Sequence, residues 1–234
     1  SALVYRPDAT WSLNAYGILV GDGEYLQVWV RDSSGAQAYV DTVGFTPTPG
    51  AWHHVAAVLD RGAAELRVYV DGALNGTATS VSVGALATSA GIEIGRQRAG
   101  SDRWHVQGSI DETRIWDVAR TTEEIQNALG KSLSGSEAGL AGYGSVDDGT
   151  AADLSINANT GSLVADATIV SSAQAFAANA SPTPDAGSTS VEQGSVVTAL
   201  ISATDTDGDL FTFALASEVS DLGRIKPANA PLEV

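Results

Sequence analysis

The stretch SIDETRIWDVARTTEEIQNAL, residues 109–129, changes character halfway along its length. Its first half, through residue 116, alternates apolar and polar side chains as a strand does, so we expect a strand there. Thr121 followed three residues later by Glu124 is typical of a helix capping box. Ile125, Ala128 and Leu129 then share one helical face before Gly130. The stretch predicts a strand followed by a helix of two to three turns, which needs a sheet edge or rim to be stable.

Upstream of this stretch the sequence reads as a series of short strands. In AELRVYVDG, residues 64–72, apolar and polar side chains alternate up to Asp71-Gly72, a strong turn signal. Short runs rich in Val, Ile, Tyr and Trp, bounded by turn residues, favour an antiparallel sandwich. The predicted strands are 16–20, 25–30, 52–60, 64–72, 92–95 and 109–116. The fold class that follows is all-β: an antiparallel two-sheet jelly-roll sandwich with one short rim helix.

Composition narrows the possible partners. The 234 residues carry a formal net charge of -16, and 44% of them are hydrophobic. A chain this acidic repels phosphate backbones, so we expect no nucleic-acid partner. No apolar run approaches the ~18 residues of a membrane span. The absence of cysteine excludes disulfides, thiol catalysis and zinc–thiolate sites. The excess of acids fits either plain solubility or calcium binding.

A change of composition near residue 172 suggests a domain boundary. Residues 173–190 are rich in Ala, Ser and Pro and lack periodicity, which is typical of a linker. Two alternating runs follow, SVVTALISATD and LFTFALA, around a turn DTDGD. We therefore expect a jelly roll over 1–172, a linker over 173–190, and a partial second β-sandwich module over 191–234. That module is short for a complete sandwich.

Five motifs in order resemble those of laminin-G-like and pentraxin-like domains, which have the concanavalin A-like lectin fold. They are the strand WHHVA, the hairpin ending YVDG, the strand ending IEIG, the strand GSIDETRIW and the helix ARTTEEI. The resemblance covers about residues 1–170 and implies a jelly roll with a short rim helix after the IDE strand. Such domains usually begin tens of residues earlier, so N-terminal strands are expected to be missing here. An open sheet edge would invite pairing with another segment or another copy.

The tail, residues 191–216, resembles the start of bacterial cadherin-like or Ig-like surface repeats through its ATDTDGD segment. Asp205, Asp207 and Asp209 in that segment bring hard oxygen ligands into one tight turn, as calcium prefers. A second, weaker set of candidate calcium ligands is Asp147, Asp148 and Asp153. The alternative for both sets is a solvated acidic turn.

Catalytic patterns are absent from the sequence. Glucanases of this fold carry a motif similar to E-x-D-x-x-E, which places its acids on one face of a strand. Asp111 and Glu112 are adjacent instead, and neighbours on a strand point to opposite faces. We therefore expect one of these two carboxylates to bond Arg114 or the helix start. No G-x-S-x-G motif occurs, and the three histidines lack metal spacing. The sequence predicts that the protein is not an enzyme.

Ligand binding would use exposed aromatic rings. Trp104 and Trp11 stand in polar surroundings where they could stack on sugars, with Asp111 as a further contact at the rim. Burial in the core is the alternative for both tryptophans. The predicted function is a non-catalytic adhesion or ligand-binding module at the cell surface, calcium-stabilised, with a glycan or protein ligand. The alternatives are a structural subunit that forms homo-oligomeric filaments by strand exchange, and an ancillary domain of a glycosidase.

Overall fold

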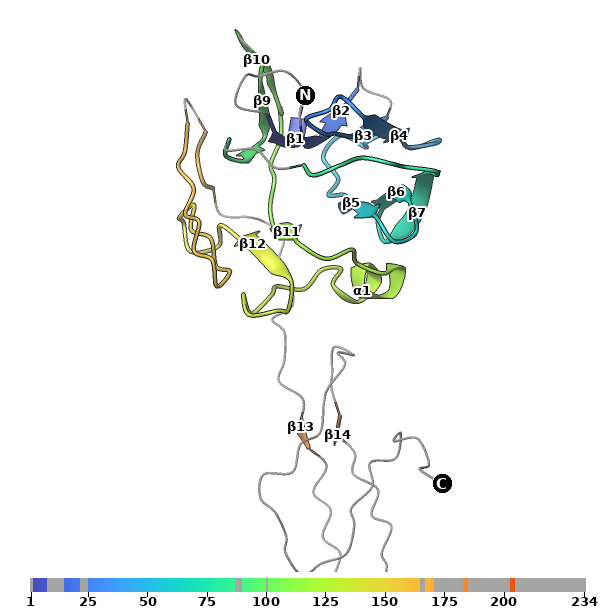
Figure 1. Ribbon diagram of the computed structural model, residues 1–234. Coiled ribbons are helices and arrows are strands. Elements are labelled where there is room, and N and C mark those ends of the chain that lie inside the picture. Colours follow the sequence, from blue (N-terminus) through green and yellow to red (C-terminus); the bar gives the residue numbers. More distant parts are fainter. Residues whose placement is uncertain are drawn as a thin grey trace, which may run out of the picture. The chain divides into compact units, whose positions relative to one another are not determined.

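The computed structural model describes residues 2–7, 15–21, 25–86, 90–99, 101–164, 167–170, 183–184 and 203–204, with the backbone alone at 97–99, 101–104 and the last two segments (Figure 1). The chain divides into two units, Ser1–Ala177 and Ala178–Val234. In the second unit, β13 (Thr183–Pro184) pairs antiparallel with β14 (Ala203–Thr204). The rest of the predicted linker and tail module, including Asp205, Asp207 and Asp209, lies outside the described residues.

A five-stranded antiparallel sheet forms the first layer of the N-terminal unit. Its order is β4-β3-β2-β1-β8. The strands are β1 (Ala2–Arg6), β2 (Tyr16–Val20), β3 (Leu26–Arg31), β4 (Gln37–Asp41) and β8 (Glu93–Ile94). Leu26, Val28 and Val30 of β3 are buried while the residues between them are half-exposed, so this sheet has one core face and one outer face.

A three-stranded antiparallel sheet, β5-β6-β7, forms the second layer. Its strands are β5 (Val55–Asp60), β6 (Glu65–Val70) and β7 (Ala73–Ala78). Asp71 and Gly72 make the β6–β7 turn, both with positive φ, as a type I′ hairpin turn requires. The turn predicted at Asp71-Gly72 is therefore confirmed.

The core lies between these two sheets. Val28, Val30 and Val40 of the first sheet pack against Leu66 and Val68 of the second, and all five are buried. Each such side chain contributes roughly 1.5–3 kcal/mol by leaving water. Figure 1 shows β1–β4 in blue and β5–β7 in cyan as the two layers.

A further hairpin, a second antiparallel strand pair and a helix belong to the same unit. β9 (Arg96–Ala99) pairs with β10 (Ser101–His105), and β11 (Thr113–Trp116) pairs with β12 (Leu140–Gly144). The strand expected at 109–116 thus begins only at Thr113, because Glu112 has a positive φ of 51° that a strand does not allow. The nearly all-β architecture with multiple antiparallel sheets is confirmed.

The helix α1 (Thr122–Asn127) begins with the expected capping box between Thr121 and Glu124. It is shorter than expected. Its one buried residue, Ile125, packs on Val58 and Tyr69, which lie on the side of the three-stranded sheet facing away from the core. The Gln126 side chain donates a hydrogen bond of 3.0 Å to the Gly72 carbonyl. The helix is therefore held against both the sheet and its β6–β7 turn.

Candidate functional site

A row of aromatic residues crosses the outer face of the five-stranded sheet. Register pairs Tyr5 of β1 with Gly17 of β2, Gly17 with Trp29 of β3, and Trp29 with Tyr39 of β4. Residues that pair directly across antiparallel strands point to the same face. The neighbouring row runs through Val4, Ile18, Val28 and Val40, and its last three members belong to the core or pack against it. The aromatic row therefore lies on the side of the sheet opposite the core, where Trp29 is half-buried and Tyr39 is exposed. We call Trp29, Tyr39 and the residues beside them on this side the aromatic face.

Gly17 allows the Trp29 side chain to lie down on the sheet. A Cβ built on Gly17 would be 3.2 Å from Nε1 of Trp29 and 3.4 Å from a ring carbon of Tyr5. The Tyr5 and Trp29 ring centroids are 6.2 Å apart with planes tilted by 54°. Tyr5 is fully buried and so supports Trp29 from one side, while Tyr39 is 62% exposed at the other end of the row.

Polar pairs flank the rings on both sides. Two residues along each strand, Gln27 pairs with Asp41, and the Gln27 Nε2 atom donates a 2.9 Å hydrogen bond to Oδ1 of Asp41. In the other direction Arg31 pairs with Gln37. All four share the face of Trp29 and Tyr39, because side chains alternate along a strand. The exposed ring of Tyr39 beside the half-buried ring of Trp29, with a few polar groups next to them, makes the kind of surface that sugars contact.

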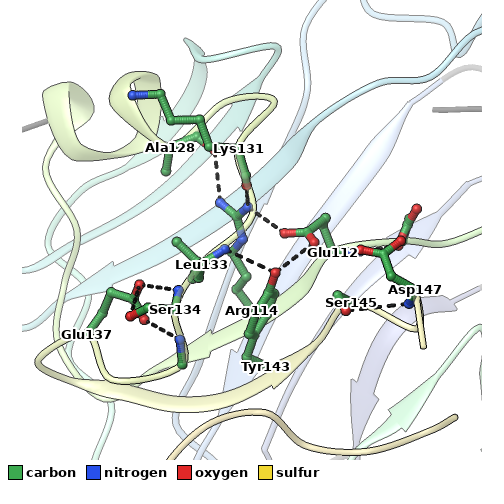
Figure 2. A network of polar contacts seen from close by, with 12 residues as sticks. Glu112, Arg114, Ala128, Lys131, Leu133, Ser134, Glu137, Tyr143, Ser145 and Asp147 are labelled. Carbon is green, nitrogen blue, oxygen red and sulfur yellow. Dashed lines mark hydrogen bonds and ion pairs between the residues drawn. The ribbon is translucent and has the colours of Figure 1, made fainter. Parts of the chain in front are cut away.

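A second polar cluster lies in the interior, around Glu112 (Figure 2). Arg114 and Tyr143 are paired across β11 and β12. The Glu112 carboxylate accepts from Arg114 Nη2 at 2.7 Å through one oxygen and from the Tyr143 hydroxyl at 2.7 Å through the other. The side chains of Arg114 and Glu112 are only 11% and 7% exposed.

This cluster ties the end of the helix to the β11–β12 strand pair. Arg114 donates to the carbonyls of Ala128 and Lys131, just beyond α1, and the Tyr143 hydroxyl accepts from the Leu133 amide at 3.0 Å. Burial and the hydrogen bond to Glu112 raise the pKa of Tyr143 to about 12. Of the two carboxylates, Glu112 makes the expected bond to Arg114. Arg114 in turn contacts the chain just after the end of the helix, and not the start of the helix.

Asp111, the expected rim contact, faces its own backbone. Its Oδ1 accepts from the Glu112 amide at 2.8 Å, which supports the unusual backbone conformation of Glu112. Its Oδ2 is buried without a hydrogen-bond partner among the described residues. Asp111 and Glu112 therefore take part in one local structure, and no solvent-facing carboxylate pair results.

Asp147, Asp148 and Asp153 do not gather around one point. Asp148 caps Thr150, with which it makes two hydrogen bonds of 2.8 Å. Asp153 accepts from the amides of Tyr143, Ser155 and Asn159. Although partial burial would raise it, these hydrogen bonds lower the pKa of Asp153 to about 2. Within the part of the chain that the structure describes, no group of three or more His, Asp or Glu residues could hold a metal ion.

The structure describes little of the two tryptophans that the sequence predicts to bind ligand. Trp11 lies outside the described residues, and of Trp104 only the backbone, in β10 opposite Gln97, is described. Sequence reasoning missed Trp29 and Tyr39. The signal was the alternation in QVWVR and QAYVD, where the residues around each valine point outward. That these two outward sets meet depends on the register between strands.

Comparison with known proteins identifies a matching family and similar structures. The family model described as "Concanavalin A-like lectin/glucanases superfamily" matches residues 2–126. No curated protein matches the chain. A candidate carbohydrate-binding protein from Bacteroides ovatus is similar in structure, with a TM-score of 0.50 and 22% identity over 65% of this chain. The chain spans 44% of that structure, so the two are compared over less than half of the larger one.

Two more distant structures are also similar. A heptameric SAP-like pentraxin from Limulus polyphemus has a TM-score of 0.39 and 21% identity, over 55% of this chain and 62% of the pentraxin. An S-layer domain-containing protein from Clostridium thermocellum has a TM-score of 0.31 and 22% identity, over 54% of this chain and 61% of that one. Separately, among the described residues no helix has the length and apolarity needed to cross a bilayer.

Proposed function

We propose, since this chain belongs to the concanavalin A-like lectin/glucanases superfamily, that it is a non-catalytic carbohydrate-binding module which holds its glycan on the aromatic face. The observation that carries the proposal is the outward row of Trp29 and Tyr39, which the β3–β4 register brings side by side. Sugar rings have apolar C–H faces that pack on aromatic rings, and their hydroxyl groups bond polar side chains nearby.

Energy considerations support a stacking role for these rings. A solvent-exposed tyrosine on the outer face of a sheet gains little for folding, since its ring is not removed from water. Tyr39 is nevertheless 62% exposed beside another aromatic residue. A ligand that covers the ring would recover the apolar contact that folding does not use.

The interior cluster supports the non-catalytic part of the proposal. A glycosidase needs one carboxyl group to give a proton to the leaving oxygen and a second to attack or to activate water. Both oxygens of Glu112 are already bonded, one to Arg114 and one to Tyr143, and its side chain is almost fully buried. Asp111 is bonded to the adjacent backbone. Glu112 is thus engaged in the interior cluster and Asp111 in a local backbone contact, and the two do not form a pair of free carboxyl groups.

The proposed setting is extracellular, with calcium bound by Asp205, Asp207 and Asp209. The support is compositional: an acidic chain without cysteine, and three acids in one turn. In this setting the module would attach a larger protein to a glycan surface.

The test is affinity electrophoresis of the full chain through gels that contain soluble polysaccharides, beginning with the β-glucan laminarin. Tyr39→Ala is the test variant. Trp52→Ala is its control, because Trp52 is 43% exposed but precedes β5 in the other sheet. We expect retardation of the parent and of Trp52→Ala, with most of it lost in Tyr39→Ala. Equal retardation of both variants would contradict the proposal, as would a parent that no polysaccharide retards.

A further inference from the structure

The hydrogen-bonded pair of Gln27 and Asp41 lies on the aromatic face, one step beyond the rings. Each member is two residues along its strand from Trp29 or Tyr39, which is about 7 Å. The pair is exposed, so its 2.9 Å hydrogen bond contributes little to stability. It does hold the carboxylate of Asp41 in a fixed orientation beside the rings.

This pair offers hydrogen-bond acceptors to the hydroxyl groups of a ligand. An ionised carboxylate only accepts hydrogen bonds, and Gln27 uses one oxygen of Asp41, which leaves further acceptor positions on the group. Gln27 keeps its own amide oxygen as an acceptor. Vicinal sugar hydroxyls offer donors to such acceptors, whereas a glycan carboxylate or sulfate offers none and is repelled by Asp41.

The opposite flank supplies donors. Arg31 and Gln37 pair across β3 and β4 on the other side of the rings. Gln37 is exposed, whereas the Nε atom of Arg31 is buried and has no hydrogen-bond partner among the described residues. A sugar that stacks on Trp29 and Tyr39 would therefore meet acceptors at one edge and the amide donor of Gln37 at the other.

We infer that the aromatic face selects neutral polysaccharides, with Gln27 and Asp41 as the residues that read their hydroxyl groups. This inference rests on the proposed function, because it concerns the same face. The charge of the whole chain acts in the same direction: 28 acidic residues against 12 basic ones place polyanions in a repulsive field. Against that field, the Arg31 cation beside the rings is not enough to attract an acidic glycan.

The experiment is isothermal titration calorimetry of the full chain at 150 mM salt with two probes. Laminarin is the neutral glycan and polygalacturonate is the acidic one. The variants are Asp41→Asn, which keeps the shape of the side chain and adds a donor, and Gln27→Ala. Glu123→Gln is the control for charge, because Glu123 is exposed in the first turn of α1. We expect the parent to bind laminarin and not polygalacturonate.

Asp41→Asn and Gln27→Ala should each weaken laminarin binding by roughly five- to tenfold, the effect of one lost hydrogen bond. Glu123→Gln should leave laminarin binding unchanged. The inference is overturned if polygalacturonate binds the parent as tightly as laminarin, or if Asp41→Asn binds laminarin like the parent.

The two proposals fail in different ways. If Tyr39→Ala abolishes laminarin binding while Asp41→Asn and Gln27→Ala do not change it, the face binds glycans but these two residues do not read them. If the parent binds neither polysaccharide and instead retains a protein ligand, both the proposed function and this inference are wrong.

Discussion

The indole of Trp29 lies over Gly17 on the adjacent strand, with Nε1 3.2 Å from where a Cβ on Gly17 would stand. The space that a side chain would fill on β2 is thus occupied by an aromatic ring from β3. Because φ of Gly17 is not in the left-handed region, the close approach of the ring explains the glycine, and the backbone does not require it.

Gly17→Val should therefore lift the indole from the sheet without unfolding the protein. We expect at least a tenfold loss of laminarin affinity, because two rings that are no longer level cannot both contact one chain. The thermal midpoint should fall by only a few degrees, as for about 1 kcal/mol in a chain of this size. Titration and a thermal melt measure both. Unchanged affinity with a shifted tryptophan emission would show that the position of Trp29 does not matter.

Glu112→Gln should be one of the most destabilising single substitutions outside the core. It leaves the Arg114 guanidinium buried without its counter-charge, which costs about 3 kcal/mol. Tyr143→Phe should cost about 1–2 kcal/mol, since Glu112 and the Leu133 amide each lose a partner. Chemical denaturation of both single variants and the double variant should give a coupling of about 1 kcal/mol. Fully additive losses would mean that the two groups act independently.

Gly72→Ala tests the docking of α1. The new Cβ would be 2.6 Å from Leu129 Cδ1, and the alanine would have to keep the φ of +76° that Gly72 has. Gly149→Ala is the matched control, because Gly149 has a φ of +77° and nothing within 4 Å. Both changes pay the backbone penalty of about 1 kcal/mol. We expect Gly72→Ala to lose more, in denaturant melts, than Gly149→Ala. Equal losses would show that the helix does not hold Leu129 against the turn.

Ionisation of Asp153 should contribute to the pH dependence of the free energy of unfolding. Its pKa of about 2 in the folded state is below the value near 3.9 of an unfolded aspartate. A lowered pKa stabilises the fold fully above pH 3.9, and this contribution is lost as the pH falls toward 2. The contribution amounts to roughly 1 kcal/mol after allowance for the partial exposure of the group. Thermal midpoints between pH 6 and 2 for the parent and Asp153→Asn measure it, and parallel curves would refute it.

Calcium binding by the tail remains a prediction from the sequence. Adding 1 mM calcium after chelation should raise the melting temperature of the unit that contains Asp205, Asp207 and Asp209, because a ligand that binds only the folded state stabilises it. Asp207→Asn should abolish the rise. Identical midpoints with calcium and with chelator would remove calcium from the account.

The features that sequence predicted are those that depend on residues near one another in the chain. The capping box of α1 and the Asp71-Gly72 hairpin need only neighbouring side chains, and both are present. The strand at 109–116 was predicted too long because Glu112 has a positive φ and its carboxylate bonds Tyr143, a partner from β12 that lies 31 positions away in the chain. Alternation alone does not reveal such a partner.

The candidate site was harder to predict because it depends on register. Trp29 and Tyr39 are ten positions apart, and only the pairing of β3 with β4 makes them neighbours. Conversely, Asp148 and Asp153 looked like metal ligands, although each is followed two residues later by a hydroxyl residue. That spacing is typical of an Asp whose carboxylate bonds its own turn, as these two do.

The most direct test of a glycan on the aromatic face is a two-dimensional amide spectrum that follows the indole N–H signals during addition of laminarin. The chain has five tryptophans, and Trp29→Phe identifies the Trp29 signal by its loss. We predict that the Trp29 indole signal shifts most and saturates with the affinity found by titration, while the Trp52 signal stays in place. A spectrum in which the Trp29 signal does not move while another indole signal does would contradict the account.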